Sequence, residues 1–116
     1  MNLQDVMDYR ASLKQLYDLL DQLFWDPATP GPAKDAIYAI NTELSSILTV
    51  LNQALVAADT TQLTTLQSSV DEVNAEIRKA QAQVNTWIKD IGIAAQVAGL
   101  MDKALALALK VFGVPS

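Results

Sequence analysis

The sequence predicts an all-α fold, an antiparallel helical bundle in one domain spanning residues 1–116, and three observations support this prediction. Apolar residues make up 51% of the chain, which is enough to bury a substantial core and argues against intrinsic disorder. They recur in alternating steps of three and four residues, as in a helix that packs against other helices. Three of the four prolines fall in one short segment, so the rest of the chain is nearly free of helix breakers.

The first helix is predicted to span about residues 2–25. Its apolar seam consists of Val6, Tyr9, Leu13, Leu16, Leu20 and Leu23. Further apolar residues widen this face near the end of the helix, which indicates more than one neighbouring helix. We expect Trp25 and Trp87 to be core residues. We expect Tyr9 and Tyr38 to lie in the core or at its boundary.

A proline-rich linker is predicted at 26–32, followed by a second helix at about 33–57. Proline disfavours a helical residue before it, but Pro32 fits the first turn of the second helix, where its missing amide hydrogen is no loss. The seam of this helix is Ile37, Ile40, Leu44, Ile47, Leu51, Ala54 and Ala58. Glu43 is the only charged residue between positions 36 and 58, and this low charge predicts a central position in the bundle.

The third helix is predicted at about 60–112, with Asp59 or Thr60 as its N-cap. It carries the longest seam, which indicates coiled-coil-like heptad packing: Leu63, Leu66, Val70, Val73, Ile77, Ala80, Val84, Trp87, Ile91, Ala94, Ala98, Met101, Leu105, Ala108 and Phe112. Lys89 and Gly92 resemble a helix end, and a break near Gly92 would give four helices instead of three. Because the apolar period continues through Gly92, we favour a continuous or kinked helix.

Residues 91–112 form an unusually apolar segment, in which the polar residues occupy one narrow stripe of Gln96, Asp102, Lys103 and Lys110. We favour a central helix or a subunit interface for this segment. A second interpretation is a helix that inserts into a bilayer or lies on it, since 22 residues suit the hydrocarbon core. The charged pair in the middle argues against a simple transmembrane span. A third interpretation is a helix that binds the groove of a partner.

Composition and motifs argue against catalysis. The chain has no cysteine and no histidine, which removes thiolate chemistry and the commonest general base and metal ligand. Three carboxylate pairs lie outside the seams and are expected to be solvated: Asp5/Asp8, Asp18/Asp21 and Glu72/Glu76. We therefore predict no enzyme activity, no metal, no cofactor and no small-molecule substrate. The net charge of −5 argues against a nucleic-acid partner.

The predicted function is a non-enzymatic interaction or structural module that self-associates or binds a protein partner through its apolar seams. The residues expected to carry this surface are Leu63, Val70, Ile77, Val84, Ile91, Met101, Leu105 and Phe112. The alternative is a membrane-active helical protein, similar to a toxin or secreted effector, whose segment 91–112 contacts a bilayer. The acidic N-terminus does not resemble a signal peptide, so we expect a cytoplasmic protein, with export by a route that needs no cleaved signal left open.

Overall fold

The prediction of an all-α fold is confirmed by a computed structural model, which describes residues 2–88 and 90–113. Within these residues there is no strand. The helices are α1 (Leu3–Phe24), α2 (Gly31–Ala57), the 3-10 helix η1 (Thr61–Leu66), α3 (Gln67–Gln81), α4 (Val84–Trp87) and α5 (Ile91–Phe112). They enclose one continuous hydrophobic core.

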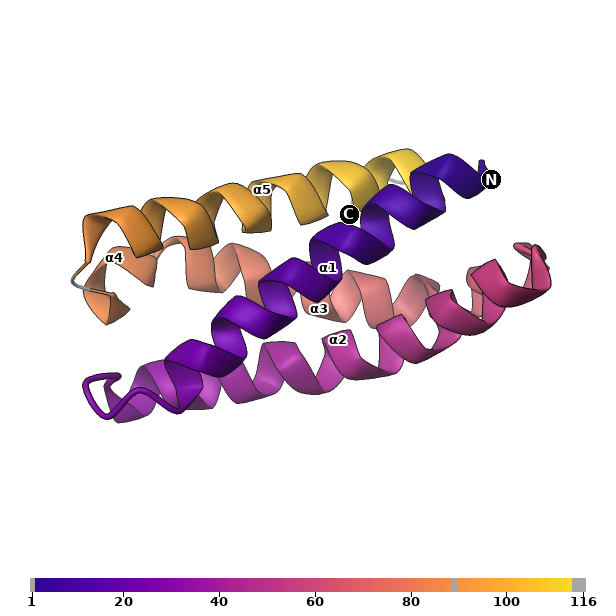
Figure 1. Ribbon diagram of the computed structural model, residues 1–116. Coiled ribbons are helices and arrows are strands. Elements are labelled where there is room, and N and C mark those ends of the chain that lie inside the picture. Colours follow the sequence, from indigo (N-terminus) through magenta and orange to yellow (C-terminus); the bar gives the residue numbers. More distant parts are fainter. Residues whose placement is uncertain (1, 89, 114–116) are drawn as a thin grey trace.

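The long helices lie along the longest dimension of the molecule. At a rise of 1.5 Å per residue, the 27 residues of α2 span about 40 Å, and the molecule measures 42 × 24 × 22 Å. Helices α1 and α3 run in one direction, and α2 and α5 run in the other (Figure 1). Each packs against two neighbours, in the cyclic order α1, α2, α3, α5. The predicted second neighbour of the first helix is therefore α5.

Local sequence signals explain where the first two helices begin. The Asn2 side chain accepts a hydrogen bond from the backbone N–H of Gln4 and so caps α1. Pro32 lies in the first turn of α2, where the sequence places it. The bounds of both helices lie within two residues of the predicted 2–25 and 33–57.

The central position predicted for the second helix is wrong. Helix α2 buries one stripe and exposes the opposite side, which carries uncharged polar residues in place of charged ones. Three of their hydroxyls donate to backbone carbonyls four residues earlier, from Thr42 to Tyr38, from Ser46 to Thr42 and from Thr49 to Ser45. These bonds satisfy the hydroxyl donors locally, so a helix poor in charge is compatible with a solvated face.

The connection between α2 and η1 is a tight turn built without glycine. Ala58 adopts the left-handed conformation (φ 52°), and the N–H groups of Ala58 and Asp59 bond to the carbonyls of Leu55 and Ala54. This is the Schellman pattern, in which glycine usually takes the left-handed position. The Asp59 carboxylate accepts from the backbone N–H and the hydroxyl of Thr61, and these hydrogen bonds lower the pKa of Asp59.

The favoured prediction of a continuous or kinked helix at 60–112 is wrong. Helix α3 ends at Gln81, and the four-residue helix α4 follows after a turn. The chain then leaves the helix at Ile88, whose backbone is extended (φ −114°, ψ 110°), and α5 begins at Ile91. The Asp90 carboxylate accepts from the N–H groups of Gly92 and Ile93 at 2.9 and 3.2 Å and caps α5. The break therefore lies just before Gly92, and the missed signal is Asp90. Lys89 lies outside the described residues.

The seam continues through the break in sequence but not in space. From Leu63 to Trp87 the predicted positions are buried. In α5 the buried residues are Ala94, Val97, Met101, Ala104, Ala108 and Val111. Three predicted positions are in that set. The other three buried residues each precede a predicted seam residue by one position, whereas Ile91 is 86% exposed and Ala98 is only half-buried. Helix α5 is thus rotated relative to the predicted seam.

Candidate binding cleft

The eight residues predicted to form an interaction surface lie in three settings. Ile91 is exposed, and Leu105 and Phe112 are half-buried against the core. The other five are buried: Leu63, Val70, Ile77, Val84 and Met101. The buried and half-buried side chains hold together the helices of one chain, and a partner would reach the buried ones only if the helices separated.

Two large aromatic residues predicted in or near the core lie on the surface instead. Trp25 is 72% exposed and Tyr38 is 66% exposed, so the core prediction for both is wrong, whereas Trp87 and Tyr9 are buried as predicted. Trp25 follows the last turn of α1, and its ring packs edge-on against Phe24 with centroids 5.1 Å apart. Tyr38 lies on the outer side of α2, next to the buried Ile37.

Trp25 and Tyr38 line one open cleft of about 670 Å³ between α1 and α2. Helix α1 and its C-cap contribute Tyr17, Asp21, Phe24 and Trp25, and α2 contributes Ile37, Tyr38, Asn41, Thr42, Ser45 and Ser46. On each helix the lining residues, some of them adjacent pairs, recur at intervals of three or four positions, so they share a flank. Four aromatic rings, one carboxylate and several neutral polar groups therefore face the same space.

The cleft is near the end of α1, where a compact turn joins the two helices. The Asp26 carboxylate accepts from the N–H of Ala28 at 2.9 Å, and the Asp26 carbonyl accepts from the N–H of Thr29 at 3.1 Å. The Thr29 hydroxyl donates back to the carbonyl of Leu23 in α1. These bonds fix the prolyl turn and hence the position of Trp25 relative to α2.

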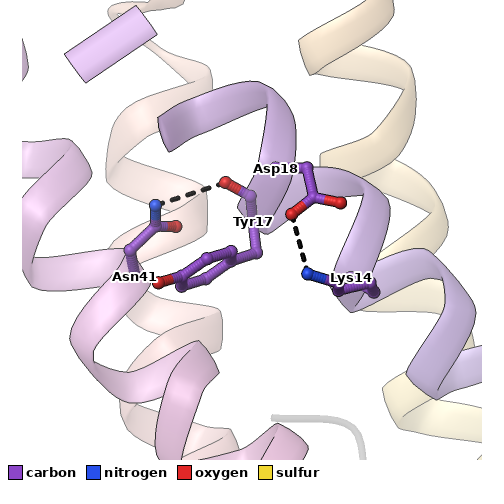
Figure 2. A network of polar contacts seen from close by, with 4 residues as sticks. All are labelled: Lys14, Tyr17, Asp18 and Asn41. Carbon is purple, nitrogen blue, oxygen red and sulfur yellow. Dashed lines mark hydrogen bonds and ion pairs between the residues drawn. The ribbon is translucent and has the colours of Figure 1, made fainter. Parts of the chain in front are cut away.

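A side-chain hydrogen bond joins the two walls of the cleft. The Asn41 amide donates from Nδ2 to the backbone carbonyl of Tyr17 at 3.3 Å, and the Tyr17 ring reaches from α1 toward α2 (Figure 2). The Lys14 ammonium lies 5.5 Å from the centroid of the same ring and pairs with Asp18 at 2.9 Å. The Tyr17 ring thus already attracts one cation within the chain.

Several polar groups of the cleft present acceptor oxygens. The hydroxyl hydrogens of Thr42 and Ser46 are used by carbonyls of α2, which leaves the hydroxyl oxygens as acceptors. Asn41 Oδ1 is buried without a hydrogen-bond donor among the described residues. Asp21 adds an exposed carboxylate, and no lysine or arginine is among the lining residues. Chemically, this lining suits an apolar or aromatic group that carries hydrogen-bond donors or positive charge.

A second, more acidic groove of about 470 Å³ adjoins the cleft. Tyr38 and Thr42 belong to both linings, and the second one includes Glu43 of α2 together with Glu72 and Glu76 of α3. Lys79 lies 3.6 Å from Glu76 and is largely exposed. The surface on both sides of Tyr38 therefore carries negative charge.

Two carboxylates outside the cleft lining make contacts between helices. Asp5 pairs with Lys110 at 3.2 Å and joins the start of α1 to the end of α5. Asp102 lies on the surface and accepts a hydrogen bond from Gln81 Nε2 of α3 at 2.6 Å. In the described part of the chain, no three metal-ligating side chains come together.

Helix α5 has a length and composition that suit a membrane span. It has 22 residues, its most apolar stretch has a mean hydropathy of 1.4, and only 28% of that stretch is buried within the chain. Its outer side carries Leu109, which is 47% exposed, and small residues such as Gly99. This length and composition occur both in helices that contact a bilayer and in helices of an ordinary protein core.

No protein-family model matches the chain, and the searches of curated proteins and of solved structures found no similar one. The features that bear on function are therefore the geometry of the cleft and of α5. The cleft could not be predicted from the sequence, because its two walls become neighbours only through the α1–α2 packing. The available signals were the wide apolar face at the end of the first helix and the polar, uncharged outer side of the second.

Proposed function

We propose that the chain is a non-enzymatic helical module that binds a protein partner, or a second copy of itself, through the aromatic cleft between α1 and α2. The observation that carries this proposal is that Trp25 and Tyr38 are both exposed and line the same cleft. Exposed aromatic residues are costly to hydrate, and they are enriched where proteins bind each other.

In this proposal the apolar seams have a different task from the one predicted. They hold an antiparallel bundle of four long helices, α1, α2, α3 and α5, in which side chains interdigitate as in a coiled coil. Complete burial of Leu63, Ile77 and Met101 supports this division between an inner face that folds the chain and an outer cleft that binds. The bundle then acts as a rigid support for the cleft.

The proposal is tested by placing a photo-crosslinking amino acid at position 38, in cells that naturally express the chain. The matched control carries the same amino acid at position 53, which is an exposed position on the same helix, outside the cleft lining. A discrete adduct from position 38 that is absent from position 53 supports a protein-binding cleft. The mass of the adduct distinguishes self-association from a different partner. Equal or absent adducts at both positions contradict the proposal.

The absolute mass of the purified chain, measured by light scattering over a concentration series, separates the two kinds of partner. A dimer that is lost when Trp25 and Tyr38 are both replaced by serine indicates self-association through the cleft. A monomer at all concentrations directs the search to another protein. These two residues are exposed, so the double variant is expected to fold.

A second candidate function is membrane association through α5, and the incomplete burial of its apolar stretch favours it. The expected behaviour is co-sedimentation of the full chain with anionic or zwitterionic vesicles, and its loss when exposed Leu109 is replaced by aspartate. Leu3→Asp is the matched control, because Leu3 is similarly exposed but lies on α1. Equal binding by both variants, or no binding by the natural chain, contradicts this function.

A further inference from the structure

The geometry points to a lysine or arginine side chain of a protein partner as the group that occupies the aromatic cleft. This inference rests on the proposed function, and it specifies the chemistry that the cleft recognises. It follows from three properties of the lining that are independent of one another: the rings, the acceptors and the charge.

The rings provide the first property. Tyr17, Phe24, Trp25 and Tyr38 surround the cleft from two helices. The face of an aromatic ring carries negative potential and attracts ammonium and guanidinium groups, most strongly for tryptophan. The Lys14 ammonium, 5.5 Å from the Tyr17 centroid, is an example of this contact within the chain itself.

The hydrogen-bonding groups provide the second property. The hydroxyl donors of Thr42 and Ser46 are turned back to the α2 backbone, and the Asn41 amide donor is turned to Tyr17. The oxygens of these side chains remain, and Asn41 Oδ1 has no donor among the described residues. A ligand rich in donors, such as guanidinium with five N–H groups, can bond to these oxygens.

Charge provides the third property. Asp21 lies in the cleft, and Glu43, Glu72 and Glu76 line the adjoining groove on the other side of Tyr38. The N-terminal half of the chain, residues 1–59, holds eight acidic and three basic residues. A cation is therefore attracted to this face over a longer range, and in the cleft it finds the Asp21 carboxylate close to the aromatic rings.

The long stem of lysine or arginine also fits the shape of the site. The methylene groups of the stem can lie against Trp25 and Tyr38, while the charged end reaches Asp21 or the hydroxyl oxygens at the α2 wall. A protein segment that presents such a side chain is the occupant to which these observations lead.

The test uses the two tryptophans of the chain as signal and control. In an amide correlation spectrum of the full chain, the indole N–H of exposed Trp25 reports on the cleft, and that of buried Trp87 reports on the core. The probes are the capped amino acids Nα-acetyl-lysine amide and Nα-acetyl-arginine amide, whose side chains keep their charge, and the neutral analogue is Nα-acetyl-norleucine amide. We expect saturable movement of the Trp25 signal with the two cationic probes, little with norleucine, and an unchanged Trp87 signal.

Two variants assign the effect to particular groups. Asp21→Asn removes the charge and retains the shape, and it is expected to weaken binding of the cationic probes by up to about fivefold, the range for an exposed ion pair. Asp8→Asn is the matched control on the same helix, outside this cleft, and is expected to have no effect. Added salt should reduce the affinity for the natural chain and have less effect on Asp21→Asn.

Several outcomes overturn the inference. Equal shifts with the norleucine probe would show that the cleft binds apolar groups without regard to charge. Tighter binding of tetramethylammonium than of the lysine and arginine probes would indicate a small quaternary ammonium ion as the ligand. No movement with any probe would exclude cation binding. The crosslinking experiment at position 38 separates this failure from failure of the proposed function, because a partner bound there without cation selectivity still gives an adduct.

Discussion

Helices α3 and α5 both bury one stripe of apolar side chains, but they differ in what lies on their other sides. The outer side of α3 is charged and includes Asp71, Glu72 and Lys79. The outer side of α5 includes Gly92, Ala95, Gly99, Ala106 and Leu109, with few polar residues. Rotating α3 about its axis would bury charge at a high cost, whereas a small rotation of α5 that keeps its polar stripe exposed exchanges one apolar group for another.

The orientation of α3 is therefore determined by its own sequence, and that of α5 is determined by its neighbours. Helix α5 packs against α1 and α3, and its end is held by two contacts with α1, the Lys110–Asp5 pair at 3.2 Å and the Phe112–Tyr9 ring contact at 6.1 Å. Phe112 lies in the same heptad position as Ile91 and Ala98, so its ring contact does not by itself select the buried face that contains Val97 and Ala104. An apolar periodicity thus specifies the face of a helix only when a polar face opposes it.

The largest expected effect comes from equal substitutions on the two sides of the break. Ile77→Ala in α3 removes a fully buried side chain and should cost about 2–5 kcal/mol in the free energy of unfolding. Ile91→Ala in α5 occupies an equivalent position of the predicted seam, but this side chain is 86% exposed and the change should stay within about 0.5 kcal/mol. Chemical denaturation of both variants measures the difference.

The result for Ile91 also tests whether α5 is covered in solution. A cost above about 1 kcal/mol for Ile91→Ala would mean that the side chain packs against something outside the chain, such as a second copy. The cost would then fall as the protein is diluted, because association stabilises the folded state by mass action. A constant cost would instead contradict the exposed position of Ile91.

The fold class and the inner faces of the first two helices could be predicted from the sequence, and the reasons are local. Residues such as Leu13 and Leu44 recur with the helical period, and each is opposed by a polar side. The break at Ile88–Asp90 was missed because the apolar period continues across it. The residue that marks the start of α5 is the N-cap Asp90. Its capping role depends on a turn, and the apolar periodicity carries no information about turns.

The cleft was missed for a different reason. Tyr17 and Asn41 are joined by a hydrogen bond although 24 positions separate them in the sequence. Tryptophan is a residue type that is often found in protein cores, but Trp25 lies at the C-cap of α1, where the chain turns toward α2. Exposure at a helix end depends on the direction of the following turn, and a single sequence does not contain that direction in any periodic form.

The second prediction concerns Tyr9, which joins α1 to the end of α5. Its hydroxyl is buried without a partner among the described residues, and burial raises the pKa of Tyr9 above its ordinary value of 10.0. Above pH 10 the Tyr9 hydroxyl ionises in the unfolded chain but stays neutral in the folded chain. The stability that the neutral hydroxyl gives the folded state is therefore complete below pH 10 and is lost as the pH rises further. One such group changes the free energy of unfolding by about 1.4 kcal/mol per pH unit.

Comparison with Tyr9→Phe isolates this effect, because phenylalanine keeps the ring contact with Phe112 and cannot ionise. We expect the natural chain to lose stability more steeply than the variant above pH 10, as measured by denaturation at several pH values. Tyr38→Phe is the matched control, since Tyr38 is exposed and should leave the slope much less affected. Parallel curves for the natural chain and Tyr9→Phe would contradict the burial of this hydroxyl.

The third prediction tests whether the break is specified locally. Asp90→Ala removes the acceptor of two N–H groups at the start of α5 and should cost about 1 kcal/mol. Asp90→Asn retains a capping oxygen and should cost much less. If Asp90→Ala is instead neutral and raises the helix content by circular dichroism, the segment 82–90 tends to form a continuous helix, and the break depends on the packing of α5 alone.

The smallest effect concerns the two glycines of α5, which distinguish its outer side from its start. A Cβ at Gly99 would meet nothing within 4 Å, so Gly99→Ala should stabilise the chain by about 0.5–1 kcal/mol through helix propensity. A Cβ at Gly92 would lie 3.3 Å from Oδ1 of Asp90, so Gly92→Ala should gain less, because it crowds the cap. Thermal denaturation of both variants measures the difference. If Gly99→Ala destabilises the chain, another molecule packs closely on the outer side of α5, since within the chain this position is open. That result would move the search for a partner from the aromatic cleft to α5.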